Sequence, residues 1–286
     1  MKQPLLLVVL SFCIFSQYTI AQGVATEPEK YTAHNKGKFY FYWGGNRESY
    51  TRSDIHFKGE GYDFTVQNAK ADDKPKGWNI DYINPSRLTI PQTNFRIGYF
   101  ISDHYNISLG FDHMKYVMRT GQTANIDGTI NLPEDHPGYV YNGTYKGTPT
   151  VLTEDFLDFE HTDGLNYLNT EFNRVDDISK LFCIANTDIF QVNITEGVGA
   201  GILYPRTNAK VLGMKRNDEF HVAGFGVSAK AGINLTFLKY FFVTGEIKGG
   251  YIDMYDVRTT HKGPDRADHR FGFLQRVIAF GGIFRI

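Results

Sequence analysis

Beyond its N-terminal segment the sequence has one cysteine, Cys183, and no run of about twenty apolar residues. A single thiol cannot form a disulfide within the chain, which excludes a fold held together by disulfides. The missing apolar run excludes a transmembrane helix, and the mean hydropathy is −0.33. The net charge of −1 provides no basic excess to neutralise phosphates, so no nucleic-acid partner is expected.

Residues 1–21 have the organisation of a signal peptide. Lys2 supplies a positive start, 5–15 form a short apolar core, and the small residue Ala21 ends the segment. This core is too short for a membrane-spanning helix, so cleavage rather than anchoring is expected. We therefore expect removal of 1–21, a periplasmic leader at 22–37 and a single β-domain at 38–286.

Eight later segments alternate apolar and polar residues with the period of a β-strand. In the first of them, Phe39, Phe41 and Trp43 share one face, while Tyr40 and Tyr42 lie on the other. The segments cover approximately 38–50, 92–101, 106–112, 165–175, 190–202, 227–236, 241–248 and 277–286.

Glu196 interrupts the apolar face of the fifth segment. Glycines at 197, 199 and 201 follow it directly. This pattern predicts a β-bulge at the glycines, with a shifted register as the alternative.

The connections between the segments are alternately short and long. The second and third segments are separated by a tight turn, as are the sixth and seventh, whereas a long polar stretch follows the first and the third. This asymmetry is typical of outer-membrane barrels. We therefore predict an all-β fold, an eight-stranded antiparallel transmembrane β-barrel with short periplasmic turns and long external loops.

Composition favours the same fold. The chain has 23 Phe, 18 Tyr and 29 Gly but only 10 Pro. Aromatic residues suit the two membrane interfaces, and glycines suit a coiled barrel wall. Several segments are longer than a membrane crossing requires, so the wall should protrude beyond the outer leaflet, and alternation at 54–57 and 62–66 predicts a β-ribbon above it. A secreted soluble sandwich is the alternative.

The signal peptide, the alternating connections and the last segment, with Phe284 near the chain end, resemble the small bacterial outer-membrane β-barrels typified by OmpA, OmpX and OmpW. The resemblance covers 38–286 and is architectural. It implies location in the bacterial outer membrane after signal removal, and contact with membrane lipid, lipopolysaccharide and the outer-membrane assembly machinery. Those barrels commonly end on an aromatic residue, whereas here Ile286 is last. The Ala-Gln signal junction and general texture also resemble Bacteroidetes barrels.

The stretch 159–167 contains a candidate catalytic motif. It loosely resembles the His-x-Ser-Asn region of outer-membrane phospholipase A and of lipid A deacylases, where the histidine is the base and the serine the nucleophile. His161 matches that base, but Asp163 occupies the serine position, which leaves Thr162 as the nearest hydroxyl. The resemblance implies a lipid hydrolase using these residues. The alternative is that His161 and Asp163 pair structurally.

Polar residues expected to face the barrel interior include charges of both signs. Buried charges are costly unless they are paired. We expect either an interlocking salt-bridge plug or a small conduit that opens transiently. The charged members of this lumen polar network are Glu48, Arg96, Asp112, Glu171, Lys230, Glu246 and Lys248.

The long loops offer two further possibilities. Their aromatic residues favour a contact surface for an external glycan or protein, unless they pack against one another. These residues are Tyr62, Phe64, Trp78, Tyr82, Tyr139, Tyr141 and Tyr145. An acidic stretch at 154–163 has oxygen ligands suited to Ca²⁺, but lacks the spacing of an EF-hand, and a solvated loop is the alternative. No metal site and no cofactor is predicted.

The leading functional hypothesis is a noncatalytic barrel with a structural or surface-interaction role and a plugged lumen. The alternatives are a lipid hydrolase using His161, and a narrow channel or carrier for small or hydrophobic molecules.

Overall fold

A computed structural model describes residues 31, 34–77 and 91–286. The predicted signal peptide, Trp78 and Tyr82 lie outside the described residues. Eight strands form the barrel, and they are here called the ring strands: β1 (Lys38–Tyr50), β5 (Thr93–Phe100), β6 (Tyr105–Met118), β9 (Leu157–Asp177), β10 (Phe190–Leu203), β13 (Gly224–Phe237), β14 (Phe241–Arg258) and β15 (Arg266–Arg285). The other elements are β2 (Ser53–Gly59), β3 (Tyr62–Ala69), β4 (Ala71–Asp72), β7 (Thr123–Ile130), β8 (Gly143–Val151), β11 (Arg206–Val211), β12 (Asn217–Phe220), and the 3₁₀ turns η3 (Tyr139–Tyr141) and η4 (Ser179–Phe182).

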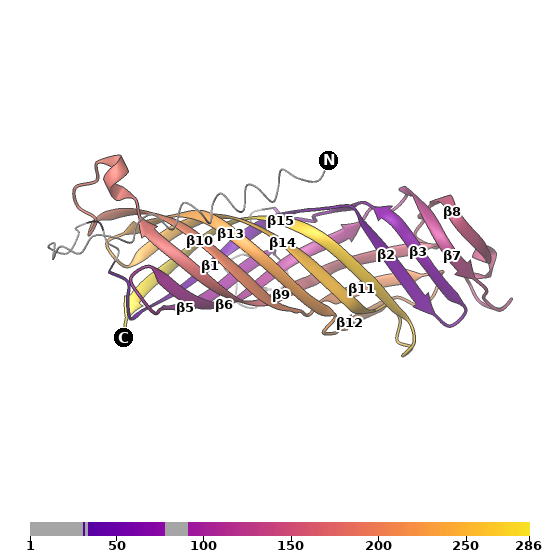
Figure 1. Ribbon diagram of the computed structural model, residues 1–286. Coiled ribbons are helices and arrows are strands. Elements are labelled where there is room, and N and C mark those ends of the chain that lie inside the picture. The colour runs from indigo at the N-terminus through magenta and orange to yellow at the C-terminus, as the bar shows by residue number, and fades with distance from the viewer. Residues whose placement is uncertain (1–30, 32–33, 78–90) are drawn as a thin grey trace, which may run out of the picture.

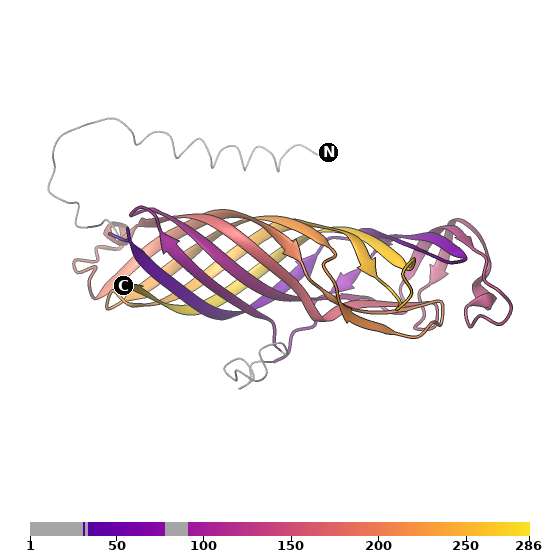
Figure 2. The ribbon, with the colours of Figure 1, turned by 90° about the horizontal axis from the view of Figure 1, so that it is seen from below.

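The ring strands form a closed antiparallel ring in the order β1-β5-β6-β9-β10-β13-β14-β15, and β15 returns to β1 (Figures 1 and 2). Following the paired residues around the ring from Tyr40 returns to β1 at Tyr50. This offset of ten residues tilts the strands strongly, as closure of a barrel requires. The predicted eight-stranded barrel is confirmed.

The two ends of the barrel differ. At one end, here called the turn end, four residues follow β5, three follow β13 and twelve, including η4, follow β9. At the other, the head end, the long connections after β1, β6 and β10 form further strands (Figure 1). The predicted asymmetry of short and long connections is present except after β14, where only seven residues lead to β15 because both strands extend into the head.

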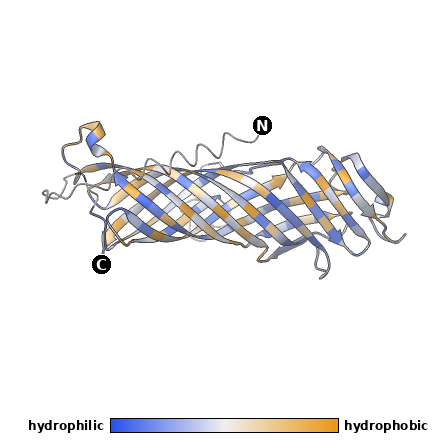
Figure 3. Cartoon of the chain, viewed as in Figure 1, coloured by the Kyte–Doolittle hydropathy of each residue, from blue (hydrophilic) through white to orange (hydrophobic). Residues whose placement is uncertain are grey.

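The outer surface of the ring carries a continuous apolar band. Leu109, Ile247 and Phe241 are 62%, 59% and 64% exposed, far more than water would favour for apolar side chains. Figure 3 shows hydrophobic and hydrophilic residues alternating along the strands, and in β14 the polar residues Thr244, Glu246 and Lys248 are buried on the inner face. Such a band suits contact with membrane hydrocarbon. Among the described residues, no helix has the length and apolarity needed to cross a membrane.

The predicted bulge in β10 is wrong. Residues 193–203 pair in unbroken register with both β9 and β13. Glu196 remains on the outer face, opposite Arg174 of β9, where opposite charges across strands are favourable. The apparent break in the pattern is thus a charged residue on the outer face, opposite Arg174 in the register, and not a change of backbone geometry.

The turn from β13 to β14 contains two nonglycine residues with left-handed backbone angles. Leu238 has φ 52° and Lys239 has φ 67°. Residues other than glycine, asparagine and aspartate pay about 1 kcal/mol or more for this conformation.

Replacing Leu238 with asparagine is expected to stabilise the barrel by roughly 1 kcal/mol, because asparagine tolerates positive φ. Urea unfolding in lipid vesicles measures the change. Leu238→Ala keeps the strained backbone and serves as the control. Equal stability of the asparagine and alanine variants would contradict the strain argument.

The head is a β-structure that continues the barrel wall. Where β1 ends, β15 pairs with β2, and β3, β7 and β8 extend the sheet in that order. On the other side β11 pairs with β9 and β12. The predicted ribbon with alternating runs at 54–57 and 62–66 is present as the paired strands β2 and β3.

Candidate functional site: the closed barrel interior

Glycines on the inner face make room for large side chains on neighbouring strands. A side chain at Gly110 would meet the Arg96 guanidinium at 2.5 Å, and one at Gly199 would meet Glu171 at 2.8 Å. The absence of a side chain at these positions lets charged groups extend across the interior. This alternation of small and large residues is how a narrow barrel is filled.

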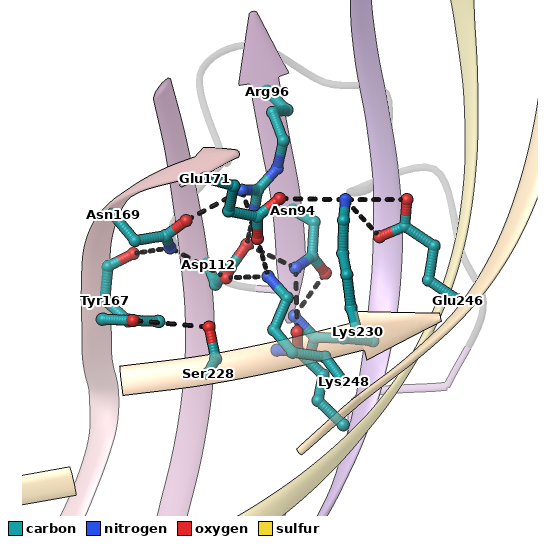
Figure 4. A network of polar contacts seen from close by, with 12 residues as sticks. Asn94, Arg96, Asp112, Tyr167, Asn169, Glu171, Ser228, Lys230, Glu246 and Lys248 are labelled. Atoms are coloured by element: carbon teal, nitrogen blue, oxygen red, sulfur yellow. Dashed lines mark hydrogen bonds and ion pairs between the residues drawn. The ribbon is translucent and has the colours of Figure 1, made fainter. Parts of the chain in front are cut away.

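Arg96 lies at the centre of the interior with its side chain fully buried. Its guanidinium contacts the Asp112 carboxylate at 2.8 Å and the Glu171 carboxylate at 2.6 Å. It also donates a hydrogen bond of 2.8 Å to Asn169 Oδ1. β5, β6 and β9 carry these groups, so the contacts join three adjacent strands (Figure 4).

Two lysines complete the network from the opposite wall. Lys248 Nζ lies 2.7 Å from Asp112 and 2.8 Å from Glu171. Lys230 Nζ lies 2.9 Å from Glu171 and 3.1 Å from Glu246. Glu246 and Lys248 therefore do not pair with each other, although they share one face of β14. Each reaches a partner on another strand.

The charges within this network balance. Arg96, Lys230 and Lys248 are opposed by Asp112, Glu171 and Glu246, and their side chains are at most 5% exposed. Breaking a buried network of this kind by removing one partner leaves an uncompensated charge. We call these six residues the charge network.

Glu48 occupies a neighbouring layer toward the head. It accepts hydrogen bonds from Gln275, at 3.1 Å, and from Gln92, which also contacts Asp73. Asn94 connects this layer to the charge network through Gln275 at 3.3 Å and Asp112 at 2.7 Å. The predicted lumen residues thus lie inside the barrel as two connected layers.

Apolar side chains fill the interior between these layers and the head. Met114, Leu165 and Tyr167 are fully buried at the head end of the barrel, and they belong to a cluster that continues through the head. The head contributes Ile55, Phe57, Tyr62, Phe64, Val66, Ile126, Phe156 and Phe159 to this core. The interior is therefore closed twice, by charge in the middle and by apolar packing toward the head.

The residues of the predicted hydrolase motif do not converge. Relative to β6, the backbone of β9 carries extra residues between His161 and Leu165, where Gly164 has φ 143°. This irregularity turns Asp163 outward, 3.7 Å from Arg206. Thr162 donates to Glu160 at 2.9 Å. The catalytic assignment stays a prediction without geometric support, and His161 and Asp163 do not pair either.

His161 is fully buried in the aromatic core of the head, on the head side of the apolar band. Its Nδ1 is 2.9 Å from Thr207 Oγ1, and burial lowers its pKa to about 3. His269 lies beside it, with ring centroids 6.2 Å apart, and contacts Ser53 Oγ at 2.9 Å. Burial, and then the nearby His161, hold the pKa of His269 well below its usual value.

His269 was not predicted to lie near His161, because the two residues are distant in sequence. Tyr116 packs against both rings, at 5.8 and 4.8 Å. The only sequence signal was alternation within 266–276, which places 269, 271 and 273 on one face. That alternation predicts the face of the strand on which His269 lies, but not the residue that it contacts.

The predicted aromatic contact surface is wrong for Tyr62 and Phe64, whereas Trp78 and Tyr82 lie outside the described residues. Tyr62 and Phe64 are 4% and 1% exposed and belong to the head core, and Tyr141 and Tyr145 pack partly against it. Tyr139 is 43% exposed. Tyr62 and Phe64 of β3 instead pack against other parts of the long loops, where they form the apolar inner face of that strand.

The acidic stretch forms ion pairs with several separate cations. Asp155 contacts Lys210 at 2.7 Å, and Glu160 contacts Lys74 and Arg216 at 3.3 Å each. Within 34–77 and 91–286, no group of three His, Cys, Asp or Glu residues is arranged to hold a metal.

No family model matches the sequence, and no curated protein matches it. Among solved structures, the outer membrane protein OprG from Pseudomonas aeruginosa is 11% identical with a TM-score of 0.35, covering 88% of this chain and 98% of that one. Ail, the attachment invasion locus protein of Yersinia pestis, is 12% identical with a TM-score of 0.33, covering 87% and 99%. The N-terminal β-barrel domain of Pseudomonas aeruginosa OprF is 9% identical with a TM-score of 0.31, covering 87% and 98%. The barrel assignment for this chain stands on its own closed ring.

Proposed function

We propose that this protein is an outer-membrane β-barrel that does not conduct and that holds a rigid β-head outside the cell. The observation that carries the proposal is the double closure of the interior, by the charge network and by the apolar core above it. A barrel of eight strands has an interior that side chains fill, and here they do. The role that remains is structural support of the envelope or interaction at the surface.

The surface of the head supports an interaction role better than a catalytic one. Strand β8 lies at the far edge of the sheet and is exposed along most of its length. An unpaired strand edge offers backbone groups to a partner. An external protein that adds a strand to this edge fits the geometry better than one that stacks on aromatic side chains.

Membrane lipid and lipopolysaccharide are the proposed partners of the outer wall, and the assembly machinery that of the last strand. Phe284 lies on the outer face of β15 and packs edge-on against Phe41, with the ring centroids 6.2 Å apart. It keeps an outward aromatic residue close to the chain end. The proposal places the turn end in the periplasm and the head outside the cell.

Two single-cysteine proteins test this orientation. Cys183 is exposed in the turn after η4, and Lys146 is exposed on β8 of the head. In intact cells a membrane-impermeant maleimide is expected to label Lys146→Cys in a Cys183→Ser background and to leave Cys183 of the natural chain unlabelled. Opening the outer membrane should expose Cys183 to the reagent. Labelling of Cys183 in intact cells would overturn the orientation.

A further inference from the structure

One arginine interrupts the apolar outer surface of the barrel. Arg276 of β15 is exposed on the outer face, between Ile278 and Leu274 along the same strand. Across the sheet it lies opposite Ile247 of β14. These three apolar side chains are 54%, 46% and 59% exposed, so they face lipid. The Arg276 guanidinium therefore emerges from a lipid-facing surface, where an isolated cation is costly.

The residue opposite Arg276 on the other neighbouring strand is a second arginine. Arg47 of β1 pairs with Arg276 in the register, and it lies on the outer face because Asn46 and Glu48 are buried on the inner one. Its guanidinium donates a hydrogen bond of 3.3 Å to the backbone carbonyl of Lys76. Like charges directly opposite each other in a sheet are destabilising, so an anion beside the two groups would stabilise the wall.

Arg276 has no acidic partner in the described part of the chain. Its guanidinium donates a hydrogen bond of 3.3 Å to Ser49 Oγ, which lies nearer the head than Arg47 does. Arg270, on the same face of β15 but closer to the head, contacts Asp253 at 3.1 Å and Asp268 at 3.2 Å. The barrel thus supplies carboxylates to the arginine near the head and leaves the charge within the apolar surface to an external anion.

A lipid phosphate has the chemistry of that anion. Guanidinium binds phosphate through a planar fork of N–H donors, and such charge-assisted bonds are stronger than those between neutral groups. Ile247, Ile278 and Leu274 surround the guanidinium with exposed apolar surface, on which the acyl chains of the same lipid pack. A soluble anion has no chains and gains nothing from this surface.

Arg276 lies in the half of the apolar surface that is nearer the head. The exposed apolar residues Ile278, Phe280 and Phe284 follow it toward the turn end, whereas the charged Arg270 lies on its head side. With the head outside the cell, as proposed above, this half belongs to the outer leaflet. Lipopolysaccharide forms that leaflet in a bacterial outer membrane, and its lipid A part carries phosphate groups.

We propose that Arg276, with Arg47 beside it, binds a phosphate group of lipid A on the outer wall of the barrel. Arg276 donates to the phosphate oxygens, Arg47 contributes a second positive charge, and the acyl chains pack on the surrounding apolar side chains. The choice of lipid A rests on the proposed function, because the orientation of the barrel decides which leaflet reaches the site. The outer wall then has a specific lipid site in addition to general contact with the membrane.

Titration of the full mature chain in a nonionic, phosphate-free detergent provides the test. Microscale thermophoresis compares diphosphoryl lipid A, the same lipid with its phosphates removed, and inorganic phosphate. Saturable binding of diphosphoryl lipid A is expected, with affinity about tenfold lower for the dephosphorylated lipid and no binding of millimolar inorganic phosphate. Equal affinity for the two lipids, or competition by inorganic phosphate, overturns the proposal.

Two variants of β15 locate the site. Arg276→Gln removes the charge and should weaken binding of diphosphoryl lipid A about tenfold. Arg270→Gln is the matched control, because Arg270 is exposed on the same face but already pairs with two carboxylates. Urea unfolding without lipid separates folding from binding, since Arg276→Gln should then be at least as stable as the natural protein. Equal lipid A affinity of the natural protein and Arg276→Gln refutes the site.

Lipid that remains bound after extraction from cell membranes identifies the source of the phosphate. Mass spectrometry is expected to find less lipid A per barrel for Arg276→Gln than for Arg270→Gln or the natural protein, with equal phospholipid. Loss of phospholipid in place of lipid A overturns lipid A as the ligand. The detergent titrations do not depend on orientation, so their failure is distinguishable from a reversed orientation in the maleimide experiment.

Discussion

Replacing Glu171 with glutamine is expected to lower the free energy of unfolding by about 3 to 5 kcal/mol. The Glu171 carboxylate contacts Arg96, Lys230 and Lys248 within 2.9 Å. Glutamine has the same size but no charge, so three buried cations would remain with two carboxylates. Urea titration of vesicle-embedded protein, read by gel mobility of folded and unfolded bands, measures the loss.

An exposed ion pair provides the control for this experiment. Asp155 contacts Lys210 at a similar distance, 2.7 Å, but its side chain is 78% exposed. Asp155→Asn should therefore leave stability nearly unchanged, because water screens such pairs. Equal effects of the two substitutions would show that the charge network contributes nothing special to stability.

The same Glu171 variant tests the double closure. Planar bilayer recordings are expected to show no conductance for the natural protein, and none for Glu171→Gln while it remains folded. Met114, Leu165 and Tyr167 continue to block the interior above the weakened network. Stepwise conductance in the natural protein would favour the channel alternative and contradict the proposed function.

Acidification from pH 7 to pH 4 is expected to destabilise the head by about 3 kcal/mol through His161 alone. The folded pKa of His161 is about 3, below its unfolded value of 6.5, so the unfolded chain binds the proton first. Stability is complete above pH 6.5 and is lost as pH falls toward 3. His269 adds to the effect in the same direction, because its pKa is also lowered.

Hydrogen exchange of head peptides, corrected for the intrinsic pH dependence of exchange, measures this loss. His161→Leu should reduce the acid sensitivity, since leucine suits the surrounding aromatic core and does not titrate. His56→Leu is the control: the His56 side chain is 38% exposed and contacts Asp63 at 2.8 Å, so its removal should leave the two buried histidines undisturbed. Identical pH profiles for the natural protein and His161→Leu would refute the role of the buried pair.

Several features of the fold were available from the sequence because lipid and lumen impose opposite demands on successive residues. Phe39, Phe41 and Trp43 alternate with Tyr40 and Tyr42, and this period of two fixes which face is inward without knowledge of any partner. The same alternation predicted that charged side chains such as Arg96 and Lys248 point into the barrel. The strands of the head were harder, since β8 has little apolar alternation and is exposed on both faces.

By itself the sequence determined the class of fold, the eight ring strands and the inward direction of the charged side chains, because each depends on local alternation. Only the tertiary structure decided the partners. Register joined Glu246 to Lys230 instead of Lys248, and a backbone irregularity turned Asp163 away from His161. Long-range packing also brought His269 beside His161 and buried Phe64. The reason is physical: parity is set by neighbours in the chain, whereas pairing is set by how eight tilted strands meet around a closed ring.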